Sequence, residues 1–410
     1  MDFNALPFDS DAMCDDLRPW IECESPTHDA AAIDRMIDLA SYDLAAMGAT
    51  IERIPGRMGL GGCVRASFPH PKAGEPGILI AGHMDTVHPV GTLARLPFRR
   101  EGGKCWGPGI QDMKGGNYLS LEAIRQLAAA NIETPLPVTV LFTPDEEIGT
   151  PATRELIEAT ARTQKYVLVP EPARPDGGLV WGRYAIARFN LRTTGTPIHA
   201  GVDPRLGRSA VREMARRILE IEEMSTDSCT FSVGCVVSDQ LHVNCVPSGC
   251  SAEALSMAKR QQDLDAGVEK MLALHDPDGA VGFHVARGVT RPVWEPSAAD
   301  KALFEHARHL AGDLGFEITA HMAGGGSDGN FTGAMGIPTL DSLGVRGAGL
   351  HTLDEHIEIE SLAERRQADG RPAGNAELIA ASQGRHPGRR AGTLSNIGRT
   401  RRKVPDLGPG

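Results

Sequence analysis

Three short apolar runs, separated by segments of a different character, constrain the fold of this sequence more than any other feature. Residues 77–82 (GILIAG), 136–144 (LPVTVLFTP) and 165–172 (KYVLVPEP) have the length and apolar character of buried strands. Residues 115–131, between the first two runs, have the pattern of a helix. Strands that alternate with helices predict an α/β fold with a largely parallel sheet, in which ligands collect at the carboxyl ends of the strands.

A different pattern interrupts this alternation in the middle of the chain. A strand with alternating apolar and polar positions at 184–194 precedes an amphipathic helix at 207–224, and further strands are expected at 229–238 and 248–258. From residue 297 the first pattern returns, with a helix, a glycine-rich loop and a strand. We therefore predict a catalytic domain in two parts, 1–183 and 297–366, interrupted by a small α+β lid, 184–296.

The charge and composition of the chain argue against several kinds of partner and location. A length of 410 residues is long for one core, and the net charge of −11 argues against a nucleic-acid partner. No apolar run approaches the ~18 to 20 residues of a membrane span, and the acidic N-terminus lacks the features of a secretory signal. We therefore expect a cytoplasmic protein with neither a membrane nor a nucleic-acid partner.

The end of the chain differs in composition from the rest. Residues 367–410 are rich in Gly, Pro and Arg and have no apolar periodicity. This composition predicts a disordered basic tail, because the segment cannot bury enough apolar surface to order itself. The alternative is that the basic cluster binds an acidic surface.

The eight cysteines predict neither disulfides nor a metal site. They are spread along the chain without a CxxC pair, so we expect reduced thiols, several of them in the core. Cys105 has no neighbour in the sequence that would make it a nucleophile. We interpret it as a core thiol.

Three adjacent carboxylates, those of Asp145, Glu146 and Glu147, directly follow the second apolar run. Adjacent acids repel one another, and the end of a structural strand rarely needs three of them. The arrangement therefore predicts that a positive charge lies beside them in the folded protein.

Other candidate ligands also lie at strand ends or in sharp turns. His83 and Asp85 follow the first apolar run, and Glu171 follows the third. Asp112 lies in a glycine-rich turn before a helix, and His351 comes late in the chain. Each motif alone also fits an ordinary polar turn, but the whole set suits one or two divalent ions such as Zn, Mn or Co. One of the adjacent glutamates then binds metal, and the other is free to act as a general base.

Seven short motifs in this order resemble the M20 metallopeptidases, and most closely their glutamate carboxypeptidase branch. The motifs are GHMDTV, GPGIQDMKGG, PDEEIG, EP, HAG, GGGSD and HTLDE, and the similarity spans roughly residues 10–365. The resemblance implies a zinc-peptidase-like catalytic domain with a mixed, largely parallel sheet. It also implies that the lid is a dimerisation domain, so that the working enzyme is a homodimer.

The resemblance also implies roles for the candidate ligands. His83 and Glu171 would hold one metal ion, Glu147 and His351 would hold the other, and Asp112 would bridge the two. Asp85 would orient His83, and Glu146 would be the general base that activates water and later protonates the leaving amine.

Further site residues are implied by the motifs of the lid and of the glycine-rich loop. His199 would reach the active site of the partner subunit and stabilise the oxyanion, and alternatively it caps a turn of the lid. Asn244 would contact the substrate or the oxyanion. Arg291 would bind a substrate carboxylate, and alternatively it is a solvated surface arginine. Residues 324–326, including Gly325, would shape the substrate pocket.

Four other histidines are interpreted as surface residues or as residues behind the metal ligands. They are His88, His242, His321 and His356.

The sequence departs from the family pattern at three places. Met257 stands where the family commonly has an arginine in the lid, which removes one anion-binding group. The segment around His199 reads GTPIHAG instead of the usual GRAAHAG form, and the final helix expected after the IEIESLAERR segment gives way to the basic tail.

These features are compatible with three functions. The first is metal-dependent hydrolysis of an amide bond in a small N-acyl amino acid or dipeptide-like substrate. The second is a metal-dependent aminohydrolase that removes an amine from a non-peptide compound, such as an aromatic amine, and the neutral Met257 favours it. The third is a binding protein without catalysis on a peptidase fold, and the complete ligand set with Glu146 argues against it.

Overall fold

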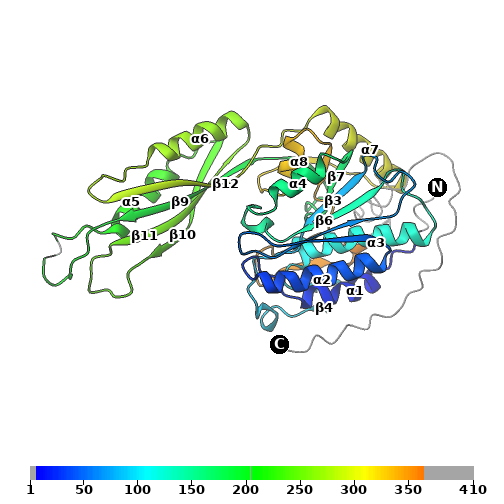
Figure 1. Ribbon diagram of the computed structural model, residues 1–410, viewed down its shortest axis with the longest axis horizontal. Helices are drawn as coiled ribbons and strands as arrows, with labels where there is room; N and C mark the ends of the chain where they lie inside the picture. Colours follow the sequence, from blue (N-terminus) through cyan, green and yellow to red (C-terminus); the bar gives the residue numbers. More distant parts are fainter. Residues whose placement is uncertain (1–5, 204, 364–410) are drawn as a thin grey trace.

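The computed structural model describes residues 6–203 and 205–363, which form two large sheets, one small sheet and the helices around them (Figure 1). The predicted basic tail, 367–410, lies outside the described residues. In the described part of the chain, no helix is both long enough and apolar enough to cross a membrane.

The central sheet has eight strands, and its middle is parallel. Strand β3 pairs in parallel with β6 on one side and β7 on the other, and β7 pairs in parallel with β14. The predicted α/β fold with a mixed, largely parallel sheet is therefore confirmed. In spatial order the strands are β1 (Thr50–Ile54), β2 (Cys63–Ser67), β6 (Val138–Thr143), β3 (Ile78–His83), β7 (Tyr166–Val169), β14 (Thr339–Asp341), β8 (Leu179–Arg183) and β13 (Ala320–Ala323).

Helices cover both faces of this sheet. This double burial explains the apolar residues of strand β3. Ile78 and Ile80 pack into the core beneath α1, α2 and α3, whereas Leu79 and Ala81 pack on the other face against α4. A strand buried on both faces is a nearly continuous apolar run, and the polar His83 comes only at the end of β3. The helices are α1 (Ser10–Glu22), α2 (Ala30–Ala46), α3 (Gly115–Ala129), α4 (Arg154–Ala161), α7 (Ala298–Leu314) and α8 (Gly329–Ala334).

Residues 185–291, here called the insertion, form a separate antiparallel sheet that projects to one side of the central sheet (Figure 1). The chain leaves the central sheet at Arg183 and returns at Trp294, and these two residues exchange backbone hydrogen bonds of 2.9 and 3.0 Å. The strand order is β10 (Cys229–Ser238), β11 (Gly249–Ala258), β9 (Ala185–Thr194) and β12 (Gly282–Arg291), and the helices are α5 (Ala210–Glu222) and α6 (Gln261–Ala273).

The two helices of the insertion cover only one face of its sheet. Phe189 and Leu191 of β9 pack in a core with Met214 of α5 and Leu264 of α6. The alternate residues of β9 point to the opposite face, because successive side chains of a strand alternate. The insertion therefore has one face without helices.

A small third sheet joins two segments that are far apart in the sequence. Strand β4 (Arg99–Glu101) pairs with β5 (Lys104–Trp106), β5 pairs with β16 (His356–Glu358), and β16 pairs with β15 (Gly347–Ala348). This pairing brings the HTLDE motif beside the GPGIQD motif. Cys105, in β5, is fully buried in the core, as predicted.

Candidate functional site

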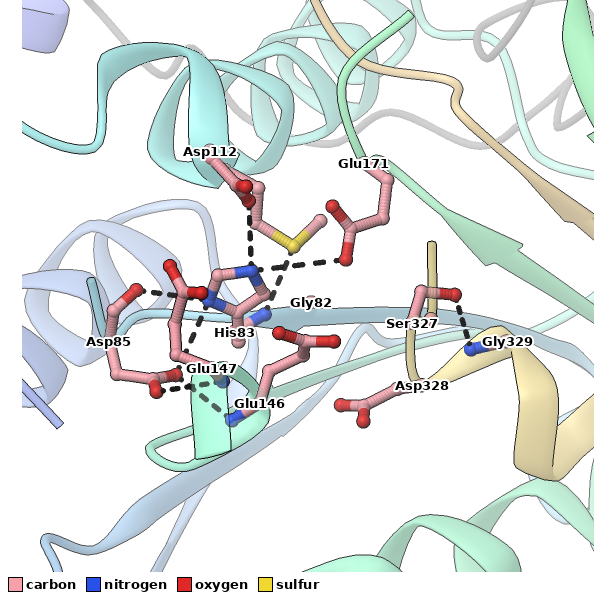
Figure 2. A network of polar contacts seen from close by, with 12 residues as sticks. Gly82, His83, Asp85, Asp112, Glu146, Glu147, Glu171, Ser327, Asp328 and Gly329 are labelled. Carbon is pink, nitrogen blue, oxygen red and sulfur yellow. Dashed lines mark hydrogen bonds and ion pairs between the residues drawn. The ribbon is translucent and has the colours of Figure 1, made fainter. Parts of the chain in front are cut away.

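The parallel strands bring the predicted ligands to one edge of the central sheet. His83 is the last residue of β3, Glu146 and Glu147 lie in a short 3₁₀ turn after β6, and Glu171 lies two residues after β7. Because carboxyl ends of parallel strands meet at one edge, these side chains gather around the imidazole of His83 (Figure 2).

Asp112 lies between two histidines and directs one oxygen towards each. Its Oδ1 atom is 3.2 Å from Nε2 of His83, and its Oδ2 atom is 3.2 Å from Nε2 of His351. The turn before α3 therefore presents a carboxylate in a geometry that suits two neighbouring ions.

Each of these histidines also has a glutamate beside it. Nε2 of His83 is 3.8 Å from Oε1 of Glu171, and Nε2 of His351 is 3.3 Å from Oε2 of Glu147. The nearest ligand atoms of His83, Asp112 and Glu147 all lie within 4.8 Å of one another, as do those of His83, Glu146 and Glu171. All five predicted metal ligands are thus brought together.

The crowding of acids in this site calls for a positive charge. Burial raises the pKa of Glu146, of Glu147 and, well above its ordinary value, of Glu171. In addition, Oε1 of Glu147 is buried and has no hydrogen-bond partner among the described residues. Carboxylate and imidazole ligands of this number suit Zn, Mn or Co. The residues therefore fit one or two divalent ions.

The shifted pKa values of the histidines and of Asp112 also indicate that the cluster suits positive charge. Hydrogen bonds to Asp112 and Glu147 raise the pKa of His351 to about 10. Burial acts to raise the pKa of Asp112, but hydrogen bonds from His351 and His83 outweigh burial and lower it. The carboxylates thus favour the protonated form of these histidines. A metal ion would replace those protons, because ligand histidines are neutral.

Asp85 connects His83 to the turn that carries the two glutamates. Nδ1 of His83 lies 3.0 Å from the backbone oxygen of Asp85 and 3.3 Å from its carboxylate. The same carboxylate accepts hydrogen bonds of 3.2 Å from the backbone N–H groups of Glu146 and Glu147. Asp85 is therefore placed to orient the imidazole and the turn together.

The three adjacent acids have different surroundings. Asp145 is fully buried and accepts hydrogen bonds from the backbone N–H groups of Ala152 and Thr153, at 2.7 and 3.2 Å. Burial raises the pKa of Asp145 to about 6. It therefore stabilises the following loop, whereas the side chains of Glu146 and Glu147 face the cluster (Figure 2).

Arg291 is an internal residue that contacts Glu146. It is only 4% exposed, so the alternative of a solvated surface arginine is wrong. Its Nη2 atom donates to Oε1 of Glu146 at 2.8 Å, and its Nη1 atom donates to Asp328 at 3.2 Å. Its predicted contact with a substrate carboxylate stays a prediction.

His199 and Asn244 lie together at the far end of the insertion. Ala200 N–H donates to the carbonyl of Asn244 at 2.9 Å, and His199 pairs with Cys245 in a β-bridge. Strand β9 begins next to the central sheet and has ten residues, so its far end is ~30 Å away. The structure therefore brings these two residues to each other but not to the metal cluster of their own chain.

The glycine-rich loop 324–326 lies between two buried arginines. Nη1 of Arg183 donates to the carbonyl of Gly325 at 2.9 Å. A Cβ atom on Gly326 would come within 2.6 Å of the side chain of Arg291, so only glycine fits there without a shift. The loop thus approaches Arg291, which contacts Glu146.

Glu355 supports the site and was not recognised from the sequence. Its Oε1 atom accepts from the backbone N–H groups of Gln111 and Asp112, at 2.9 and 3.1 Å. Its Oε2 atom accepts from Gly109 N–H at 3.0 Å and lies 2.7 Å from Nε2 of His88. Glu355 thereby fixes the backbone that carries Asp112. Its presence in the HTLDE motif was the available signal.

The other histidines have no contact with the cluster. His88 and His356 are buried, the former against Glu355 and the latter beside Trp106. His321 bonds to Asp176 at 2.8 Å, and His242 is exposed. Of these four, only His88 bears on the site, through Glu355.

Comparisons with known proteins identify the class that this fold and this cluster define. Carboxypeptidase G2 from Pseudomonas sp. (strain RS-16) is 30% identical over 376 residues, which cover 88% of this chain and 89% of that protein. Succinyl-diaminopimelate desuccinylase from Dechloromonas aromatica (strain RCB) is 28% identical over 70% of this chain and 80% of its own. The crystal structure of aminopeptidase PepT from Bacillus cereus ATCC 10987 has a TM-score of 0.68 at 24% identity, covering 92% of this chain and 98% of that one.

The fold and the cluster are those of a metallohydrolase that acts on amide bonds. Residues 79–368 match the sequence model of peptidase family M20/M25/M40, and the chain belongs to this family. The prediction that it is an enzyme, a hydrolase acting on C–N bonds, is confirmed. The binding-protein alternative is therefore wrong.

Replacing Glu355 by alanine is expected to weaken metal binding. The loop from Gly109 to Asp112 loses three hydrogen bonds, and residues that orient metal ligands typically contribute 10- to 100-fold to affinity. Competition with a chromogenic chelator measures the affinity for Zn. Glu358→Ala is the matched control, because Glu358 lies in the neighbouring strand and pairs with Arg346. Unchanged affinity in a folded Glu355→Ala protein would contradict this role.

Proposed function

We propose that this protein hydrolyses the amide bond of a small N-acyl amino acid or dipeptide-like substrate, with Glu146 as the general base. The observation that carries the proposal is the carboxylate of Glu146, only 11% exposed, beside a cluster in which Asp112 faces two histidines. Two relatives whose names describe amide hydrolysis, a carboxypeptidase and a desuccinylase, support the substrate class.

Five residues would hold the metal ions. His83 and Glu171 would hold one ion, His351 and Glu147 would hold the other, and Asp112 would be shared between them. A divalent ion in this position supplies positive charge, which polarises a carbonyl group and lowers the pKa of water toward ~7. Zn, Mn and Co all accept these ligands, and the choice among them stays a prediction, as does the cytoplasmic location.

Glu146 would move the protons of the reaction. Its carboxylate takes a proton from the attacking water and later gives it to the leaving amine. Arg291 holds one oxygen of this carboxylate and also donates to the backbone carbonyl of Glu146 at 2.9 Å. Arg291 thereby orients the general base, whichever contact it makes with substrate.

A second function has one observation in its favour. Met257 is half-buried on the face of the insertion without helices, where it offers no charge to a substrate. A substrate without a carboxylate, such as an aromatic amide or amine, would suit such a position. The same metal cluster and Glu146 would serve this aminohydrolase reaction.

We further propose that the insertion is a lid and a dimerisation domain. Its edge strand β10 and the following loop expose Val236, Val237, Leu241 and Val243, which are 50% to 100% exposed. An edge strand with exposed apolar residues is a template for pairing with another chain. A second copy of this chain, related by two-fold symmetry, would cover this edge.

In such a dimer His199 would act on the site of the partner subunit. Nδ1 of His199 accepts a hydrogen bond from Gly201 N–H at 3.1 Å, so the neutral ring carries its proton on Nε2. This proton is available to an oxyanion. His199 lies beyond the far end of β9, a strand of ~30 Å that begins next to the central sheet, so the partner's site is the one that it would reach.

Replacing Glu146 by glutamine is expected to abolish turnover while the metal content stays near normal. Glutamine keeps the shape of the side chain but cannot accept the proton, and loss of a general base costs on the order of 10²- to 10⁴-fold. Rates on N-acyl amino acids and metal analysis of the same preparation check both parts. Glu155→Gln, on an exposed residue of α4, is the control. An unchanged rate in the Glu146→Gln protein would contradict the role of Glu146 as general base.

Metal removal is expected to eliminate activity reversibly. Dialysis against a chelator should leave an inactive protein, and adding Zn, Mn or Co should restore the rate, because the ions supply the charge that the carboxylates need. Metal analysis verifies the removal. Activity that persists in verified metal-free protein would exclude this mechanism.

Mixed dimers test whether His199 acts in trans. Glu146→Gln and His199→Ala are each expected to be inactive, but a dimer with one copy of each contains one intact site. Equal mixing with full exchange should recover about a quarter of the wild-type activity, since half of the dimers then have one working site of two. Mixing Glu146→Gln with the double variant is the control. No recovery despite demonstrated exchange would favour action within one subunit.

A further inference from the structure

An arginine on the insertion contacts the backbone of the turn that carries Glu146 and Glu147. Arg188 lies in β9, and its side chain is half-buried on the face without helices. Its Nη2 atom donates to the backbone carbonyl of Glu147 at 3.3 Å. A guanidinium group from the insertion therefore lies beside the segment that carries two of the candidate active-site glutamates.

The charge of Arg188 is not paired, in contrast to its two neighbours. Arg183 forms an ion pair with Asp341, and Arg291 pairs with Glu146 and Asp328. Within residues 6–203 and 205–363, no carboxylate lies within 4.0 Å of the guanidinium of Arg188. Of these three arginines at the junction, Arg188 alone has a charge that is free to pair with a ligand.

The surroundings of Arg188 on the sheet are apolar. Leu255 lies directly opposite on β11, and the next pair along the two strands is Ile186 with Met257. Directly opposed and diagonal residues of antiparallel strands lie on one face and within reach of long side chains. All three neighbours are half-buried. An anionic group bound at Arg188 would thus have apolar surfaces around it.

The position of Arg188 near the junction keeps it close to the site when the insertion moves. It lies five residues after Arg183, whereas His199 lies five residues beyond the far end of β9. A rotation about the junction displaces atoms in proportion to their distance from it. Arg188 therefore stays near Glu147 over a range of lid positions.

We propose that Arg188 binds the carboxylate of the substrate and, with Ile186, Leu255 and Met257, selects N-acylated amino acids with apolar side chains. In such a molecule the carboxylate is one carbon atom from the amide nitrogen. Arg188 contacts the backbone of Glu147, so the anion site that it forms lies close to the cluster, as such a substrate requires. This inference rests on the proposed function, whose substrate class it narrows.

Binding without turnover tests the inference. The metal-loaded Glu146→Gln protein is titrated calorimetrically with N-acetyl-L-methionine and with its carboxamide, which lacks the negative charge. Adding Arg188→Met should weaken binding of the carboxylate about 10- to 100-fold, the effect of losing a hydrogen bond between charged groups. Binding of the carboxamide should change less than about twofold. Arg188→Lys should keep part of the affinity, because it keeps the charge.

Two further variants separate recognition from a structural effect. Arg192→Met is the matched control, since Arg192 lies on the same strand and face but pairs with Asp239. It should leave both affinities unchanged. Met257→Arg, added to Arg188→Met, should restore preference for the carboxylate, because it returns a charge to a diagonal position on the same face.

The outcomes distinguish this inference from the proposed function. The role of Arg188 would be overturned if Arg188→Met weakened the affinity for both compounds equally or for neither. It would also be overturned if neither compound bound to the Glu146→Gln protein. Hydrolysis of N-acetyl-L-methionine by the wild-type protein is measured alongside. If the carboxylate binds through Arg188 but no amide is hydrolysed, the result contradicts the proposed hydrolysis and supports the anion site at Arg188.

Discussion

The carboxylate of Asp112 has to stay between two imidazoles, and much of the molecule holds it there. Strand β3 supplies His83 from the central sheet, and the small third sheet brings in the segment of His351. Glu355 fixes the backbone of Asp112 itself. Because each oxygen of Asp112 faces a different histidine, a rotation of this one side chain would disrupt both halves of the cluster.

The candidate site residues of the insertion lie in two places, one next to the junction and one at the far end of its sheet. Arg291, at the end of β12, reaches the cluster directly through Glu146. His199 and Asn244 lie at the opposite end of the same sheet, beyond the reach of their own cluster. Arg291, near the junction, therefore contacts Glu146 directly, whereas His199 and Asn244 have no contact with the cluster of their own chain.

The features that were predictable from the sequence are those with a local signal. The continuous apolar run of β3 reflects burial on two faces, and His83, Glu147 and Glu171 lie at or shortly after the ends of strands. Strand β12 was missed because this edge strand, GFHVARGVTR, carries polar residues and glycines. The burial of Arg291 depends on ion pairs with Glu146 and Asp328, and Glu355 acts on residues 243 to 246 positions earlier. Apolar periodicity records none of these contacts.

The pairing of β5 with β16 has a consequence for the order in which this protein is made. Chains are synthesised from the N-terminus, and domains generally fold as units as they emerge. The strands of the insertion lie close together in sequence and need nothing that follows them. His351 and Glu355, in contrast, leave the ribosome after nearly all other described residues. A nascent chain therefore has an incomplete candidate cluster until the segment that carries His351 and Glu355 has emerged.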